Sequence, residues 1–209
     1  MPVWWVAGWG VLGAAAGGGI RWVSIRLAKA EELESGQSAL VTLGPAVLSA
    51  TLFVLFAATH RRDLASLLVA TVFVLVLVQV IFFDLEHELI LDRVVLPVAA
   101  FALVVSLFRQ PWWAGIAAGL VSGGAFLLLG GVGSLIAHRD ALGLGDVKLA
   151  TLIGLMLGPG YAAEALLIGF LSAGVAAIAV AIWRRSLEGR MALGPYLAVG
   201  ALIALYPLP

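Results

Sequence analysis

The sequence predicts an all-α fold, a polytopic membrane bundle of about eight transmembrane helices. The first observation is composition: 63% of the 209 residues are hydrophobic, 11% are charged, and the mean hydropathy is +1.11. A soluble domain has about 45–50% apolar and about 25% charged residues. The second observation is spacing, because hydrophobic runs alternate with short breaks and each span needs roughly 20 residues. No room is left for a soluble domain, so we expect residues 1–209 to form a single membrane-embedded domain.

The hydrophobic runs define the expected helices. In chain order they cover 3–27, 39–59, 64–84, 89–108, 111–137, 145–158, 160–183 and 191–208. The sixth run is short, and only the turn signal Gly158-Pro159-Gly160 separates it from the seventh, so six or seven spans also fit. We expect two N-terminal spans in residues 1–63 and the chemistry in residues 64–208. No basic residue precedes Arg21, so the first run lacks the basic region of a cleaved signal peptide and is read as a retained helix.

The basic residues predict an orientation. With the N-terminus outside, nine of the twelve Lys and Arg residues fall on the cytoplasmic side, as the positive-inside rule requires. These nine are Arg21, Arg26, Lys29, Arg93, Arg139, Lys148, Arg184, Arg185 and Arg190. The outer side keeps Arg61, Arg62 and Arg109. In this orientation Asp84, at the end of the third run, and Asp146, at the start of the sixth, both lie at the cytoplasmic boundary.

The composition also limits function. Cysteine is absent, which excludes disulfides and Cys-based zinc sites. The chain has no long basic run, so we do not expect nucleic acid as a partner. We expect the helices to be surrounded by the lipid bilayer. No second acidic cluster supports a metal site around His87, so we expect neither a metal nor another cofactor.

Asp84 and Asp146 are the strongest candidates for chemistry. Carboxylates beside a bilayer core are costly and are functional-site hypotheses by default. Both are predicted at the same depth and on the same side of the membrane, so we expect them to pair with each other. Two facing membrane aspartates are the catalytic groups of an aspartyl protease. The alternative for Asp146 is a helix start, with glycines in a loop and the aspartate as the cap. Asp92 is the rival for the role of Asp84, with Arg93 beside it as an expected ion-pair partner.

Other residues are expected to support this pair. Gly143 and Gly145 would let a backbone approach closely and leave Asp146 open to water. Lys148 either pairs with a carboxylate or extends to the headgroups. Gly194 and Pro195 fit an ordinary helix entry or a backbone surface beside the active site. Glycines repeating every four residues, at Gly115, Gly119 and Gly123, predict small-residue helix packing.

Three motifs in this order resemble the type IV prepilin peptidase family. The first runs from Asp84-Leu85 to Asp92, with Leu91 where the family usually has proline. The second is Gly-x-Gly-Asp-x-Lys-Leu at Gly143–Leu149, and the third is Gly-Pro-Tyr-Leu at Gly194–Leu197. The resemblance covers roughly residues 64–208.

The resemblance implies an aspartic endopeptidase in the plasma membrane of a prokaryote, with its site facing the cytoplasm. The implied substrate is a prepilin or pseudopilin-like protein, whose basic leader Glu86, Glu88 and the acidic stretch Glu31–Glu34 could attract. Family members that also methylate the new N-terminus carry a large insert with two Cys-x-x-Cys pairs after the first span. Here the corresponding loop, 27–38, is about a dozen residues long and has no cysteine, which predicts that methyltransferase activity is absent.

Asp84 and Asp146 are expected to share one proton around a bound water and to titrate in two coupled steps. Which aspartate is acid and which is base stays open, as do the individual substrate and the oligomeric state. Two alternatives remain: a small transporter that uses the aspartates as proton or cation sites, and a scaffold subunit in which they are capping groups.

Overall fold

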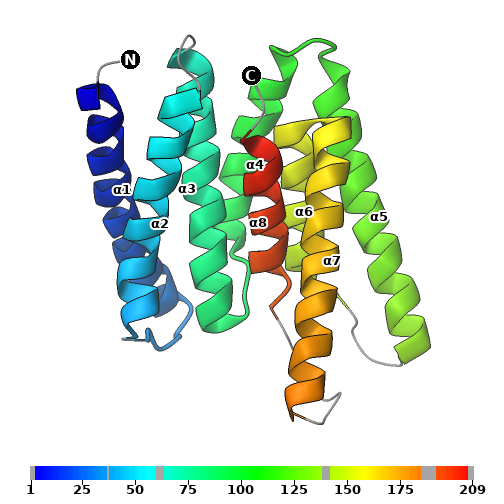
Figure 1. Ribbon diagram of the computed structural model, residues 1–209. Coiled ribbons are helices and arrows are strands. Elements are labelled where there is room, and N and C mark those ends of the chain that lie inside the picture. The colour runs from blue at the N-terminus through cyan, green and yellow to red at the C-terminus, as the bar shows by residue number, and fades with distance from the viewer. Residues whose placement is uncertain (1–2, 37, 60–63, 138–141, 185–191, 207–209) are drawn as a thin grey trace. The chain divides into compact units, whose positions relative to one another are not determined.

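The computed structural model describes residues 3–36, 38–59, 64–137, 142–184 and 192–206. Within these ranges the chain has eight α-helices and no strand (Figure 1), which confirms the all-α prediction. The chain divides after Glu88 into two compact units, of which the first spans 1–88 and the second 89–208. The third helix therefore groups with the two N-terminal helices.

The first unit contains three helices that lie side by side (Figure 1). They are α1 (Val3–Ala30), α2 (Ala39–Thr59) and α3 (Leu64–His87). Glycines on α1 bring its backbone against α2: a Cβ on Gly13 would lie 2.6 Å from the Ser49 carbonyl oxygen, and one on Gly17 would overlap Pro45. Such small-residue contacts are the usual basis of helix packing in membranes, where van der Waals contact replaces the hydrophobic effect.

The second unit contains five helices packed around α6. They are α4 (Asp92–Leu107), α5 (Trp113–Ala137), α6 (Leu144–Leu157), α7 (Pro159–Arg184) and α8 (Gly194–Leu205). α6 contacts each of the other four, and Leu149, Leu152 and Ile153 on it are fully buried. This position makes α6 the core helix of the unit.

The predicted glycine face of α5 packs against α6, as expected from its four-residue spacing. A Cβ on Gly119 would lie 2.8 Å from Leu155 Cγ, and one on Gly123 would overlap the Thr151 hydroxyl. The α7–α8 pair uses the same kind of contact, since a Cβ on Gly169 would lie 2.8 Å from the Leu197 Cα.

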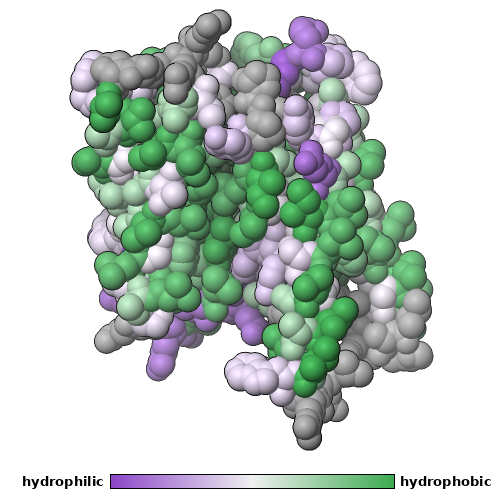
Figure 2. Space-filling model, viewed as in Figure 1, coloured by the Kyte–Doolittle hydropathy of each residue, from purple (hydrophilic) through white to green (hydrophobic). Residues whose placement is uncertain are grey.

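Five of the described helices, α1, α2, α3, α5 and α7, are long and apolar enough to cross a membrane. The remaining three, α4, α6 and α8, have 16, 14 and 12 residues, fewer than the roughly 20 that a span requires. Large hydrophobic side chains point outward along the helices, for example Leu128 on α5 and Leu171 on α7. Figure 2 shows hydrophobic residues over most of the visible surface and strongly hydrophilic ones mainly near helix ends. These features are those of a polytopic membrane protein.

The carboxyl end of α6 is fixed by a glycine–proline turn and by an arginine. At its carboxyl end Gly158 adopts φ +76° and Pro159 begins α7, as the turn signal predicts. Arg109, from the segment between α4 and α5, donates from Nη1 to the Met156 carbonyl oxygen. Burial lowers the pKa of Arg109, and this bond to a terminal carbonyl offsets part of the cost, because a cation is favourable at a helix carboxyl end.

Candidate functional site

Asp84 lies in the last turn of α3 and belongs to the first unit. Its side chain is buried, with 4% of the residue exposed. The helix continues to His87, three residues beyond the hydrophobic run, and the N–H of Glu88 donates to the Asp84 carbonyl oxygen at 2.8 Å. Glu88 adopts the left-handed conformation with φ 51°, which ends the helix. The first aspartate is therefore held at a helix end, next to a polar segment.

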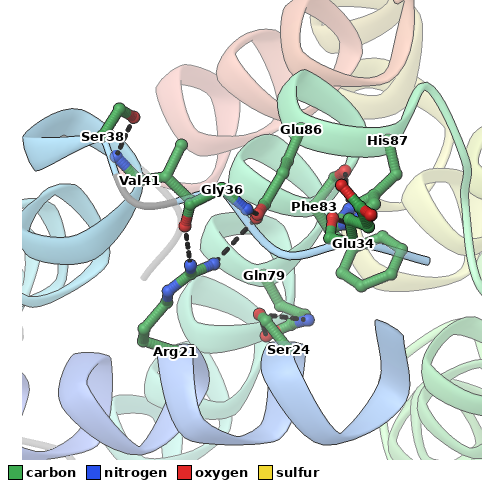
Figure 3. Close-up of polar contacts among 10 residues, drawn as sticks. All are labelled: Arg21, Ser24, Glu34, Gly36, Ser38, Val41, Gln79, Phe83, Glu86 and His87. Carbon is green, nitrogen blue, oxygen red and sulfur yellow. Dashed lines mark hydrogen bonds and ion pairs between the residues drawn. The ribbon is translucent and has the colours of Figure 1, made fainter. Parts of the chain in front are cut away.

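Two side chains just after Asp84 contact the connection between α1 and α2 (Figure 3). Glu86 Oε2 pairs with Arg21 Nη1 of α1 at 2.8 Å, and Glu86 Oε1 accepts from the Gly36 N–H. His87 Nε2 lies 3.1 Å from the Glu34 carbonyl oxygen. Glu86 thus turns into the protein, whereas Glu88 is exposed. The role of these two glutamates in leader binding stays a prediction.

Asp146 lies in the first turn of α6 and belongs to the second unit. The N-cap is Gly143, with an extended backbone and no side-chain cap, so the expectation that the aspartate itself caps the helix is wrong by three positions. The Asp146 N–H donates to the Gly143 carbonyl oxygen at 3.1 Å. A Cβ on Gly143 would lie 3.4 Å from Asp146 Oδ2, and Asp146 is only half-buried. A carboxylate in a first helical turn is favoured by the helix dipole.

Gly145 provides room for the protein's own chain. A Cβ at this position would lie 2.9 Å from the Cβ of Ile90, closer than side chains normally approach. The predicted close approach of a backbone is therefore seen here as contact with Ile90, in the segment that leads into α4. No signal in the sequence marks Ile90 as a partner of this glycine.

Lys148 pairs with Asp92 at the same end of α6. Lys148 Nζ donates to both carboxylate oxygens of Asp92, at 2.6 and 2.7 Å. Of the two expectations for Lys148, pairing with a carboxylate is confirmed. The ion pair is open to solvent, with 39% of the Lys148 side chain and 53% of the Asp92 side chain exposed. The start of α4 is thus fixed to the helix that carries Asp146 by one apolar and one ionic contact.

Gly194 and Pro195 begin α8 and are both buried. Pro195 occupies the first helical turn, where its missing N–H costs nothing, and the Leu197 N–H donates to the Leu193 carbonyl oxygen at 3.2 Å. The helix-entry interpretation of this motif is confirmed. Its use as a backbone surface beside an active site stays a prediction.

The candidate residues divide between the two units. Asp84, Glu86 and Glu88 are in the first, and the other members of the predicted set are in the second: Gly143, Gly145, Asp146, Lys148, Asp92, Gly194 and Pro195. Sequence reasoning missed the role of Arg21 as the partner of Glu86, because 65 residues separate them. Among the residues that the structure describes, no three His, Asp or Glu side chains are placed to hold a metal ion.

The comparisons with known proteins point to one peptidase family. The type IV leader peptidase family model matches residues 71–180, slightly more than half of the chain. A prepilin leader peptidase/N-methyltransferase of Legionella pneumophila is 27% identical over 161 residues, which is 75% of this chain and 55% of that protein. The chain thus spans about half the length of that curated relative. No solved structure matches it. On the match over residues 71–180, the chain belongs to the type IV leader peptidase family.

Proposed function

We propose that this chain is an aspartic endopeptidase that removes the leader peptide of prepilin-like membrane proteins, with Asp84 and Asp146 as its catalytic pair. One observation carries the proposal: the segment matched by the family model, 71–180, contains both aspartates. Each of them also lies in the terminal turn of an apolar helix, at the end of α3 or the start of α6. At such positions a carboxylate meets polar surroundings without leaving the membrane helix.

The chemistry that two such carboxylates support is peptide hydrolysis by an activated water. Two close carboxylates cannot both ionise cheaply, so they share a proton and titrate as a pair. The ionised member takes a proton from the water, which attacks the scissile carbonyl carbon. The protonated member donates a hydrogen bond to the carbonyl oxygen, and a proton then reaches the leaving amine. The aspartates therefore act as a general acid and a general base.

The contacts at the start of α6 support a role for its neighbours in holding the turn that carries Asp146. Ile90 contacts Gly145, and Asp92 pairs with Lys148. In this proposal Asp92 and Lys148 support the site, and Asp84 is the first catalytic aspartate.

We further propose that the enzyme lies in the plasma membrane of a prokaryote with its site at the cytoplasmic face. If all eight helices cross the membrane, as the sequence predicts, nine of the twelve Lys and Arg residues fall on that side, which satisfies the positive-inside rule. A prepilin leader is a basic segment on the cytoplasmic side of a hydrophobic helix, so enzyme and scissile bond would meet at the same depth.

We also propose that the chain does not methylate the new N-terminus. α1 ends at Ala30 and α2 begins at Ala39, so the connection is too short for the insert that accompanies methylation. The chain also contains no cysteine. A mature substrate isolated after cleavage by this enzyme alone should have an unmodified N-terminus by mass spectrometry. A product heavier by one methyl group would refute this.

The test of the main proposal is leader cleavage in membranes. A candidate prepilin is co-expressed with wild type, Asp84→Asn, Asp146→Asn or Asp92→Asn, and its size is read by gel and mass spectrometry. Because each catalytic aspartate transfers a proton, Asp84→Asn and Asp146→Asn should each lower the cleavage rate by about 10²–10⁴-fold. Asp92→Asn should retain most of the rate.

The other outcomes point elsewhere. An inactive Asp92→Asn beside an active Asp84→Asn would move the first catalytic position to Asp92. A folded wild type that cuts none of several leaders would favour the transporter or scaffold alternatives.

A further inference from the structure

We infer that Arg21, Glu86 and His87 form a clasp that holds residues 33–36 against the last turn of α3 and thereby positions Asp84. This inference rests on the proposed function of Asp84. All members of the clasp belong to the first unit, and Figure 3 shows Arg21 from α1 and Glu86 and His87 from α3 converging on the α1–α2 connection. Arg21 and Gly36 already occupy the Glu86 carboxylate. All three residues therefore have a positioning role, in place of the leader contact that the sequence predicts for Glu86.

The ionic half of the clasp joins three parts of the chain. Arg21 Nη1 donates to Glu86 Oε2 at 2.8 Å, while its Nη2 donates to the Gly36 carbonyl oxygen. Glu86 Oε1 accepts from the Gly36 N–H. The backbone N–H and the carbonyl oxygen of Gly36 are therefore both hydrogen-bonded by the Arg21–Glu86 ion pair. The pair is well shielded, with 11% of the Arg21 side chain and 7% of the Glu86 side chain exposed, so it is screened little by solvent.

The second half is the His87 ring. Its Nδ1 lies 3.3 Å from the Phe83 carbonyl oxygen and its Nε2 lies 3.1 Å from the Glu34 carbonyl oxygen. The ring also stacks on Phe83, with the centroids 4.5 Å apart. His87 therefore connects the last turn of its own helix to the residue two positions before Gly36. Two consecutive side chains of α3 thus hold one short segment at two points.

The last turn of α3 needs such support. Terminal carbonyl groups of a helix lack intrahelical partners, and acidic side chains at a carboxyl end are opposed by the helix dipole. Here Asp84 and Glu86 both lie in that turn. Arg21 supplies the compensating positive charge, and the bonds to residues 33–36 prevent the turn from fraying. Since a displacement of about 1 Å at a catalytic group can cost about 10²-fold in rate, fixing this turn fixes a reacting group.

A second polar contact between the same two helices provides a matched control. Gln79 Nε2 of α3 donates to Ser24 Oγ of α1 at 3.0 Å, and both residues are buried. This pair links α1 to α3 as the clasp does, but no bond from it to the α1–α2 connection is present among the described contacts. Removing the Ser24–Gln79 contact therefore weakens the α1–α3 packing without removing the bonds to residues 33–36.

The experiment uses the full-length protein in membranes. The double variant Arg21→Met/Glu86→Met removes the ionic half of the clasp without leaving one charge buried alone, which is the arrangement that unfolds proteins. Its control is Ser24→Ala/Gln79→Leu. Since the chain has no cysteine, a spin label on Ser35→Cys reports the motion of residues 33–36 in each background. Leader cleavage gives kcat and KM separately.

The clasp predicts a specific pattern. In Arg21→Met/Glu86→Met the label becomes mobile, kcat falls by about 10- to 100-fold and KM changes little. A rise in KM with kcat unchanged would overturn the positioning role and support leader binding by Glu86. The control keeps a restrained label and a kcat within about threefold of wild type, as expected for a substitution away from reacting groups. Arg21→Lys keeps the charge but loses the second arm on Gly36, and it replaces the double variant if that fails to fold.

Two further results would overturn the inference. A label that stays restrained in the clasp variants would mean that the Arg21–Glu86 pair does not hold residues 33–36. A mobile label with unchanged kcat would mean that the segment does not position Asp84. If wild type cleaves no leader, the proposed function fails and the Asp84 part fails with it. The label still decides whether the clasp holds the segment.

Discussion

The two units hold their candidate aspartates in opposite ways. In the first, Asp84 lies at the carboxyl end of a 24-residue helix, where the helix dipole opposes a carboxylate, and a shielded ion pair lies two residues away. In the second, Asp146 lies in the first turn of a 14-residue helix, where the dipole favours it, and the nearby Lys148–Asp92 pair is open to solvent. We infer from this difference that the placement of Asp84 depends on surrounding contacts, whereas the placement of Asp146 is set mainly by its own helix.

The largest expected effect tests the shielded ion pair. Arg21→Met leaves the Glu86 carboxylate without its cationic partner in a site where only 7% of its side chain is exposed. Removing one member of a buried pair typically costs about 3–5 kcal/mol. We therefore expect a large loss of stability in thermal unfolding of the detergent-solubilised protein, followed by circular dichroism.

The control for this prediction is Arg21→Met/Glu86→Met, which removes both charges and should recover most of the lost stability. If the single variant unfolded at the wild-type temperature, the shielded Arg21–Glu86 pair would contribute no more to stability than an open ion pair.

A smaller effect separates neighbouring glycines on α1. A Cβ on Gly17 would overlap the backbone of Pro45 and Ala46, whereas one on Gly18 would meet nothing within 4 Å. Gly17→Ala should therefore cost about 1–3 kcal/mol through overpacking. Gly18→Ala should raise stability by up to about 1 kcal/mol, since alanine is the better helix former.

A matching pair of neighbouring glycines, one packed and one open, lies on α5 in the second unit. A Cβ on Gly123 would overlap the Thr151 hydroxyl, and one on Gly124 would meet nothing within 4 Å. Because a hydroxyl can rotate and the Pro45 backbone cannot, Gly123→Ala should cost less than Gly17→Ala in the same unfolding assay. Equal losses would show that Thr151 is as fixed as a backbone atom.

The order and type of the helices could be predicted from the sequence because hydrophobic runs and turn residues are local signals. The break at Gly158-Pro159 and the glycine face of α5 are examples, and both match the structure. The contacts at the candidate site could not be predicted in the same way. Arg21 lies 65 residues from Glu86, and Ile90 contacts Gly145 across 55 positions. Such partners depend on how helices pack, which no spacing in one segment encodes.

The ion pair of Asp92 is a further contact that local sequence does not predict. Its neighbour Arg93 is the expected ion-pair partner, yet the bidentate pair in the structure is with Lys148, 56 residues away. Adjacent residues at the start of a helix point in different directions. A partner on another helix therefore depends on α4 and α6 being packed together, and this contact forms only in the folded unit.

The smallest expected effect tests that open pair. Lys148→Met removes a charge whose side chain is 39% exposed, opposite one that is 53% exposed. Exposed ion pairs contribute about 0–1 kcal/mol and are screened by salt. We expect Lys148→Met to change the unfolding temperature little, and the small difference from wild type to shrink further when salt is raised.

Arg21→Met should behave differently in the same salt series, because its partner is shielded and salt reaches it poorly. A stability loss in Lys148→Met as large as that in Arg21→Met, and equally insensitive to salt, would mean that the ion pair beside Asp146 is as essential to its unit as the one beside Asp84 is. The second aspartate would then also depend on surrounding contacts, and the contrast between the two units would reduce to the direction of the helix that carries each carboxylate.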